Sequence, residues 1–180
     1  PNSYKEAMDS PLAKEWHDSM LDELESMKRH NVWTLVDPPK GAKPIACRWV
    51  YKIKPAQADD TPIFRSRLVA KGFKQRQGID YTELFSPVAR YDTLRILLSL
   101  CAARKMHSRQ FDIKTAFLYG SLDETIYMNQ PPGFEDGTNK VAKLQRSIYG
   151  LKQSSRAFNS KLCSVLKSLR MTQSQADPCL

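Results

Sequence analysis

The feature that most constrains the fold is a pair of neighbouring segments, 45–54 and 63–71, in which basic residues recur at alternating positions. Because successive side chains of a β-strand point to opposite faces, each segment predicts a strand with an apolar face and a basic face. The turn-rich stretch PAQADDTP joins them, so together they predict a β-hairpin with cations along one side. These cations are Lys52, Lys54, Arg65, Arg67 and Lys71.

The segments that precede and follow this hairpin predict helices and short strands. Ser3 and Glu6 fit a capping box, and Ser10-Pro11 marks the start of a second helix that Asn31 can end. VWTLV (32–36) and TIYMNQ (125–130) predict strands. Helices that alternate with antiparallel hairpins are typical of the α+β class, which we therefore predict.

Three more elements are predicted in the second half of the chain. Asp92 can cap a helix over 93–105, whose apolar residues are dense enough to predict full burial. HSRQFDI (107–113) predicts a short strand ending at Asp112. A last helix is predicted from about 154 to 169.

The charge of the chain is concentrated in one segment. The 180 residues carry a net charge of +9 and are 41% hydrophobic, which is enough for one domain with a core. Residues 1–39 hold four basic and eight acidic side chains, whereas 40–76 hold ten basic and two acidic. This concentration predicts a positive patch for a polyanion such as nucleic acid, and a solvated basic face is the alternative.

The sequence lacks the patterns typical of zinc-binding, membrane-spanning and secreted proteins. Cys47, Cys101, Cys163 and Cys179 show no zinc-knuckle spacing, which predicts reduced, mostly buried thiols in an intracellular chain. There is no apolar run of membrane length and no signal peptide, so no membrane partner is expected. Both ends of the sequence suggest a chain cut from a longer one.

Three features could carry chemistry, and each has a simpler alternative. The hairpin cations could converge on phosphates or could make an exposed sheet face soluble. Asp112, at a strand end, could be a ligand of a hard cation such as Mg²⁺ or could cap the following turn. In YGLKQSSR (149–156), Gly150 permits close approach of another backbone or a base. Lys152, Gln153 and the two serines place donors for an anion at a helix N-terminus, and a simple start of a helix is the alternative.

One family resemblance joins these features and covers nearly the whole chain, from about Glu6 to Leu180. It rests on four motifs in the expected order: RSRLVAKGFKQRQGIDYTELFSPVAR, QFDIKTAFLYG, IYMNQPPGF and SIYGLKQSSRAF. Together they resemble the reverse transcriptase domain of a copia-type retrotransposon polyprotein. The resemblance implies a right-hand polymerase fold, of which this chain holds the fingers and part of the palm. The implied divisions are an N-terminal helical arm (1–31), fingers (32–91), palm (92–121), fingers again (122–151) and incomplete palm (152–180).

The resemblance also implies roles for individual residues. Asp112 would be the first catalytic aspartate and would bind two Mg²⁺ ions, with the Ile113 carbonyl as a further ligand. Phe117 would exclude a ribose 2′-OH. The nucleotide would contact Lys54, Arg67, Gly150 and Gln153, while nucleic acid would contact Lys52, Arg65, Lys71 and Lys152.

The implied activity is that of an RNA-directed DNA polymerase, with two Mg²⁺ ions assisting an in-line displacement. The implied partners are an RNA template, a DNA primer, deoxynucleoside triphosphates and the rest of the Pol polyprotein, in cytoplasmic virus-like particles and the nucleus. The family's aromatic-x-Asp-Asp hairpin is not found, because the one adjacent pair, Asp59-Asp60, lies in the fingers turn. The chain is therefore expected to be inactive alone, and a non-catalytic nucleic-acid-binding relic of a retrotransposon is the alternative. A protein-interaction module built on the N-terminal helix is a third class of function, and only the amphipathic pattern of that helix supports it.

Overall fold

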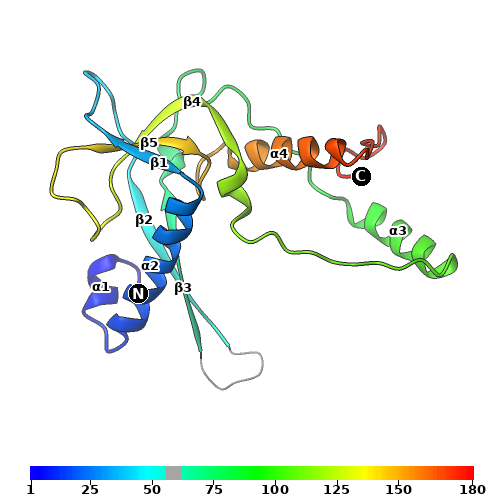
Figure 1. Ribbon diagram of the computed structural model, residues 1–180, viewed down its shortest axis with the longest axis horizontal. Helices are drawn as coiled ribbons and strands as arrows, with labels where there is room; N and C mark the ends of the chain where they lie inside the picture. Colours follow the sequence, from blue (N-terminus) through cyan, green and yellow to red (C-terminus); the bar gives the residue numbers. More distant parts are fainter. Residues whose placement is uncertain (56–61) are drawn as a thin grey trace.

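A computed structural model describes residues 1–55 and 62–180 of the chain (Figure 1). Asp59-Asp60 therefore lies outside the described residues. The elements run in the order α1 (Tyr4–Met8), α2 (Ala13–Arg29), β1 (Trp33–Val36), β2 (Cys47–Lys54), β3 (Ile63–Ala70), η1 (Gly72–Lys74), α3 (Tyr91–Ala103), η2 (Ala116–Tyr119), β4 (Ser121–Met128), β5 (Val141–Arg146) and α4 (Ser154–Ser168). Helices thus mix with antiparallel strands, which confirms the α+β class.

The strands form two separate sheets. One has the order β1-β5-β4, and the other is the predicted hairpin of β2 and β3, called the ribbon below. Two backbone hydrogen bonds fix the base of the ribbon. Ile45, just before β2, donates to Tyr127 of β4 at 2.8 Å, and Ala70 of β3 donates to Tyr149, in the segment between β5 and α4, at 2.8 Å. Its other end projects away from the first sheet (Figure 1). Strand β5, which no sequence pattern predicted, is the centre of the first sheet.

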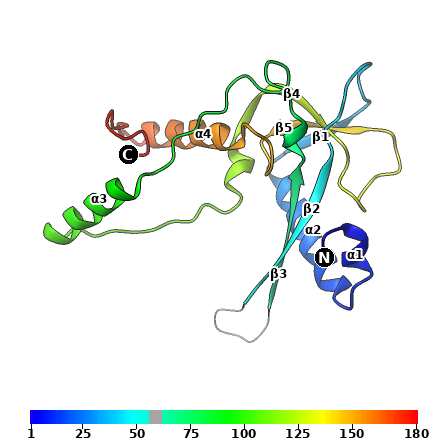
Figure 2. The same ribbon diagram turned by 180° about the vertical axis from the view of Figure 1, so that it is seen from behind.

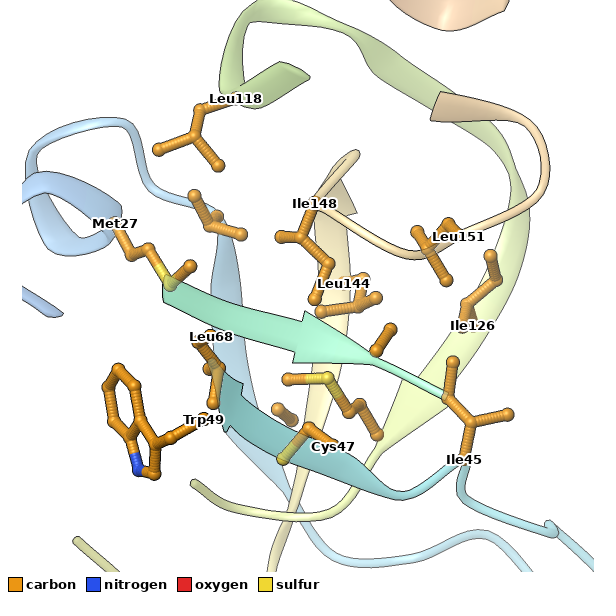
Figure 3. Packing of buried hydrophobic residues seen from close by; sticks show 14 of the residues in the cluster. Met27, Ile45, Cys47, Trp49, Leu68, Leu118, Ile126, Leu144, Ile148 and Leu151 are labelled. Carbon is orange, nitrogen blue, oxygen red and sulfur yellow. The ribbon is translucent and has the colours of Figure 1, made fainter. Parts of the chain in front are cut away.

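The core lies where the apolar face of the ribbon meets the first sheet and α2. Figure 3 shows Trp49 and Leu68 of the ribbon gathered with Leu144 of β5 and Ile148 beyond it. These side chains are almost completely buried. Burial of this kind contributes roughly 1.5–3 kcal/mol per large apolar side chain, so this cluster holds the two sheets together.

The N-terminal arm belongs to the same packed unit. The capping box is confirmed, because Ser3 Oγ accepts the Glu6 N–H at 3.2 Å. Helix α2 begins at Ala13 rather than at Pro11, since the Ser10 hydroxyl accepts the Leu12 N–H and closes a separate turn. The helix ends as predicted before Asn31, which has a left-handed φ of 50°.

Helix α2 also covers the free edge of β3. The backbone N–H of Ser66 donates to Ser19 Oγ at 2.6 Å, and one turn further along the Glu23 carboxylate hydrogen-bonds the backbone of Leu68. These are strand groups that no neighbouring strand satisfies. Two side chains of the helix therefore take the place of a third strand.

The prediction that 93–105 would be buried is wrong. Helix α3 stands apart from both sheets in Figures 1 and 2, and none of its residues is buried; Leu94, Ile96 and Leu98 are 48%, 62% and 52% exposed. Its N-cap is Arg90 rather than Asp92, which lies in the first turn. Apolar density brings burial only where another element can cover the helix, and the described residues supply none.

The predicted strand at 107–113 is also wrong, since these residues form no regular element. A strand needs a partner for its backbone groups, and none of the described segments pairs with this one. The last helix and the strand at 125–130 are confirmed by α4 and β4.

All four cysteines are free, as predicted, but only Cys47 is buried. No helix within 1–55 and 62–180 has the length and apolar character needed to cross a membrane. The right-hand arrangement and its division into fingers and palm remain predictions.

Candidate functional site

A cavity of about 830 Å³ lies between α2, the ribbon and the loop that leads into η2. Its wall includes six of the residues that the sequence singled out, from segments far apart in the chain. They are Lys54, Arg65, Arg67, Asp112, Ile113 and Phe117. The other predicted residues, Lys52, Lys71, Gly150, Lys152 and Gln153, do not line it. We call this space the ribbon cavity.

The ribbon register explains why its cations share one face. Lys52 lies directly opposite Arg65, and Val50 lies opposite Arg67. Residues opposite each other in an antiparallel pair point to the same side, so the predicted basic face is confirmed. Within the described residues these cations form no salt bridge. No described acidic side chain therefore occupies their donors, which can meet an anion.

Asp112 lies in an exposed loop, and a fixed turn follows it. Thr115 has a left-handed φ of 57°, after which η2 begins. The Ser147 hydroxyl donates to the Phe117 carbonyl, and the Phe117 ring packs edge-on against Tyr149 at 4.9 Å between centroids. Phe117 is thus held by the segment between β5 and α4, while Asp112 remains open to solvent.

The cavity has an acidic wall that the sequence analysis assigned no chemistry. Asp22, Glu23 and Glu25 of α2 line it opposite the ribbon cations. Burial raises the pKa of Glu23 above its usual 4.5, and the neighbouring Arg67 and Arg65 charges, together with the Leu68 backbone, partly offset this. The amphipathic pattern of α2 indicates which face is polar, but it does not indicate what that face meets.

Gly150 allows close contact between two backbone segments, as the sequence predicted. Its φ is +90°, and a Cβ at this position would lie 2.2 Å from the carbonyl oxygen of Ala70. A Cβ on Gly72 would likewise lie 2.0 Å from the Gly150 carbonyl. The end of β3 and the start of the α4 segment can therefore pack only through glycines.

Lys152 and Gln153 contact the segment that follows β3. Gln153 is buried and donates to the Asp80 carbonyl at 2.9 Å and to Glu124 at 3.2 Å. The Lys152 ammonium donates to the Gln75 carbonyl at 3.1 Å and lies 4.8 Å from the centre of the Tyr81 ring. Gln153 also lines a second cavity of about 830 Å³ beside α4, which the Arg156–Glu83 ion pair borders.

The ribbon cavity does not by itself form a metal centre. Across residues 1–55 and 62–180, no three His, Cys, Asp or Glu side chains come close enough to hold an ion. Asp112 and the Ile113 carbonyl offer one carboxylate and one carbonyl, whereas Mg²⁺ takes six oxygen ligands, several of them often waters. These residues fit as part of a ligand set, and no reaction step through a metal follows from them.

Comparison with known proteins matches this chain to reverse transcriptases. The family described as reverse transcriptase (RNA-dependent DNA polymerase) matches residues 30–180. The retrovirus-related Pol polyprotein from transposon TNT 1-94 of Nicotiana tabacum is 42% identical over 182 residues, which covers 100% of this chain and 14% of the polyprotein. The corresponding polyprotein from transposon RE1 of Arabidopsis thaliana is 39% identical over 92% of the chain and 12% of its own length.

A more distant relative is the transposon Ty1-BL Gag-Pol polyprotein of Saccharomyces cerevisiae, which is 35% identical over 50% of the chain and 5% of its own length. No solved structure matches. The chain thus spans a small part of each of these polyproteins. The family match covers most of the chain and includes the loop of Asp112 and the ribbon, so the chain belongs to the reverse transcriptases of copia-type retrotransposon Pol polyproteins.

Proposed function

We propose that this chain is part of an RNA-directed DNA polymerase that copies retrotransposon RNA into DNA by two-metal nucleotidyl transfer. The observation that carries the proposal is the ribbon cavity, where Asp112 and Phe117 face Lys54, Arg65 and Arg67. Phosphoryl transfer needs cations that hold a polyphosphate close to a carboxylate that can bind metal. Membership of the reverse transcriptase family supports the same activity.

The proposed roles are those that the family resemblance implies. Lys54 and Arg67 contact the incoming triphosphate, and Phe117 excludes a ribose 2′-OH. Gly150 and Gln153 lie beside the nucleotide and the template base. The cations outside this group contact nucleic acid; they are Lys52, Arg65, Lys71 and Lys152. In this proposal the ribbon is the fingers of a right-hand polymerase, and the loop of Asp112 belongs to its palm.

Reverse transcriptases generally use a divalent metal, and we propose Mg²⁺ here, with two ions in the complete enzyme. The Asp112 carboxylate and the Ile113 carbonyl would be among their ligands. Because Asp112 has no cluster of carboxylates around it within the described residues, the 180-residue chain alone is expected not to extend a primer.

The proposed partners are an RNA template, a DNA primer and deoxynucleoside triphosphates, together with other parts of the Pol polyprotein. The proposed location is the cytoplasmic virus-like particle and the nucleus. A second candidate function is a non-catalytic nucleic-acid-binding relic of a retrotransposon. The absence of a metal-binding cluster around Asp112 within the described residues favours it, because the cations that bind a nucleic-acid backbone do not depend on a metal site.

Binding of an RNA–DNA hybrid tests the proposal. Fluorescence anisotropy of a labelled hybrid, measured from low to moderate salt, should give a binding constant that falls steeply with salt. Lys52→Gln should weaken binding and reduce the salt slope by about one. Lys14→Gln, an exposed cation on α2 outside the ribbon, is the matched control and should leave the slope unchanged. A slope that responds equally to both substitutions, or no binding of the hybrid, would contradict the proposal.

Primer extension tests the expected inactivity of the isolated chain and can exclude the relic. The purified chain, a primed RNA template, Mg²⁺ and labelled deoxynucleotides should give no incorporation. If the original chain incorporates nucleotides and Asp112→Asn abolishes this, the relic is excluded. The same result would contradict the expectation that the chain cannot extend a primer without a carboxylate cluster around Asp112.

A further inference from the structure

Tyr149 joins the ribbon to the loop of Phe117, although no sequence motif assigned it a role. Its backbone is fixed, because its carbonyl accepts the Ala70 N–H at 2.8 Å and the next residue is Gly150, packed against β3. Its side chain is 47% exposed and lines the ribbon cavity. A rigid backbone thus presents an open aromatic ring to the cavity.

The ring contacts two side chains of the proposed nucleotide site. The guanidinium carbon of Arg67 lies 5.0 Å from the Tyr149 ring centre, within the range of a cation–π interaction. The Phe117 ring also packs edge-on against it, with centroids 4.9 Å apart. Among the described residues, Arg67 forms no side-chain hydrogen bond and no ion pair within 4 Å, so the ring is its defined contact.

A contact of this kind positions a cation without neutralising it. An acidic partner would occupy the N–H donors of Arg67, whereas an aromatic ring leaves them available for an anion. The nearby acid is Glu23, whose pKa burial raises, so it is less readily ionised than an exposed carboxylate. Holding the side chain in advance also reduces the entropy lost when an anion binds.

We infer that Tyr149 is a positioning residue that holds the Arg67 guanidinium and the Phe117 ring in place for a nucleoside triphosphate. The inference rests on the proposed function, since it takes the ribbon cavity to be a nucleotide site. The aromatic ring carries the effect, and the hydroxyl is not needed. Loss of the ring should weaken triphosphate binding by about 5- to 10-fold, the range expected for a partly exposed cation–π pair.

The test is calorimetric titration of the purified chain with 2′-deoxythymidine triphosphate. Tyr149→Leu keeps an apolar side chain beside Phe117 but removes the ring, and it should weaken triphosphate binding by about 5- to 10-fold. Tyr149→Phe should bind within about twofold of the original chain, since it retains the ring. Tyr91→Leu, an exposed tyrosine on α3, is the matched control and should not change binding. Urea unfolding of each variant identifies any loss that comes from misfolding.

A double-mutant cycle with Arg67→Gln tests the mechanism. If Tyr149 acts through Arg67, then Tyr149→Leu should add less than about twofold once Arg67 is replaced. Full additivity would overturn the inference, as would unchanged binding by Tyr149→Leu or an equal loss in Tyr149→Phe. If the original chain fails to bind the triphosphate, the proposed nucleotide site itself fails, and the inference fails with it.

Discussion

Replacing Gly150 by alanine should lower the free energy of unfolding by about 3 kcal/mol, because the change combines backbone strain with a collision. The φ of +90° places the residue in the left-handed region, where a Cβ costs about 1–2 kcal/mol. The new Cβ would lie 2.2 Å from the Ala70 carbonyl oxygen and 2.6 Å from Val69 Cγ1, so the two backbone segments must separate. Their separation breaks the bond from Ala70 to Tyr149, which contributes about 1 kcal/mol more.

Gly137→Ala is the matched control for this prediction. Gly137 has a similar φ of +78°, but nothing lies within 4 Å of the position that a Cβ would take. It should therefore show the backbone strain alone, about 1–2 kcal/mol. The excess for Gly150→Ala measures the contact between the end of β3 and the segment that leads into α4.

Urea unfolding followed by tryptophan fluorescence provides the assay, since Trp49 is buried in the core. In a thermal melt the two variants should lose roughly 6–12 °C and 2–8 °C, from the usual 2–4 °C per kcal/mol at this size. Equal losses for the two variants would refute the reasoning. They would mean that the two backbones do not approach closely in solution.

Three further predictions concern charge, accessibility and packing. Burial raises the pKa of Glu23 in the folded chain, so the folded state holds that proton more tightly and stability should fall as pH rises from about 4.5 through the folded pKa. The urea midpoint should therefore depend less on pH in Glu23→Gln than in the original chain. An equal dependence on pH in the two chains would contradict this prediction. Burial also raises the pKa of the Cys47 thiol to about 12, so iodoacetamide should label the exposed Cys179 well before Cys47. Mass spectrometry of the two peptides measures the labelling rates, and equal rates would count against a closed core. Leu98→Ala on α3 should change the free energy of unfolding by less than about 0.5 kcal/mol, whereas Leu144→Ala, at 3% exposure, should lower it by about 2–5 kcal/mol. Similar losses in the same urea assay would show that α3 is covered in solution.

Local periodicity predicted the elements whose signal is complete within a few residues. The ribbon and α4 are examples, since alternation or helical spacing marks each of them. Strand β5 was missed because Val141 and Ala142 are both buried, which breaks the alternation expected of a half-exposed strand. It is defined by its neighbours, β1 and β4, and the first of these lies more than a hundred residues earlier in the sequence.

Two of the wrong predictions share one cause. The burial of α3 and the strand at 107–113 both require a covering or pairing element, and the described residues supply none. The candidate site has the same dependence on distant parts of the chain. Separate sequence motifs identified Asp112 and Arg67, but they did not identify which side chains these residues meet. The contact between Arg67 and Tyr149 depends on how β3 pairs with the segment before α4, and no local pattern records it.

The way α2 covers the edge of β3 has a consequence for how the chain is made. Synthesis proceeds from the N-terminus, so α2 emerges before β3 and is available as soon as that strand forms. Ser19 and Glu23 can then occupy the edge groups of Ser66 and Leu68 before another molecule does. An open strand edge invites pairing with a second chain, which leads to aggregation. The N-terminal arm (1–31) would therefore protect the edge of β3 from other chains during synthesis. A version lacking residues 1–31 should form insoluble β-rich assemblies as it is synthesised.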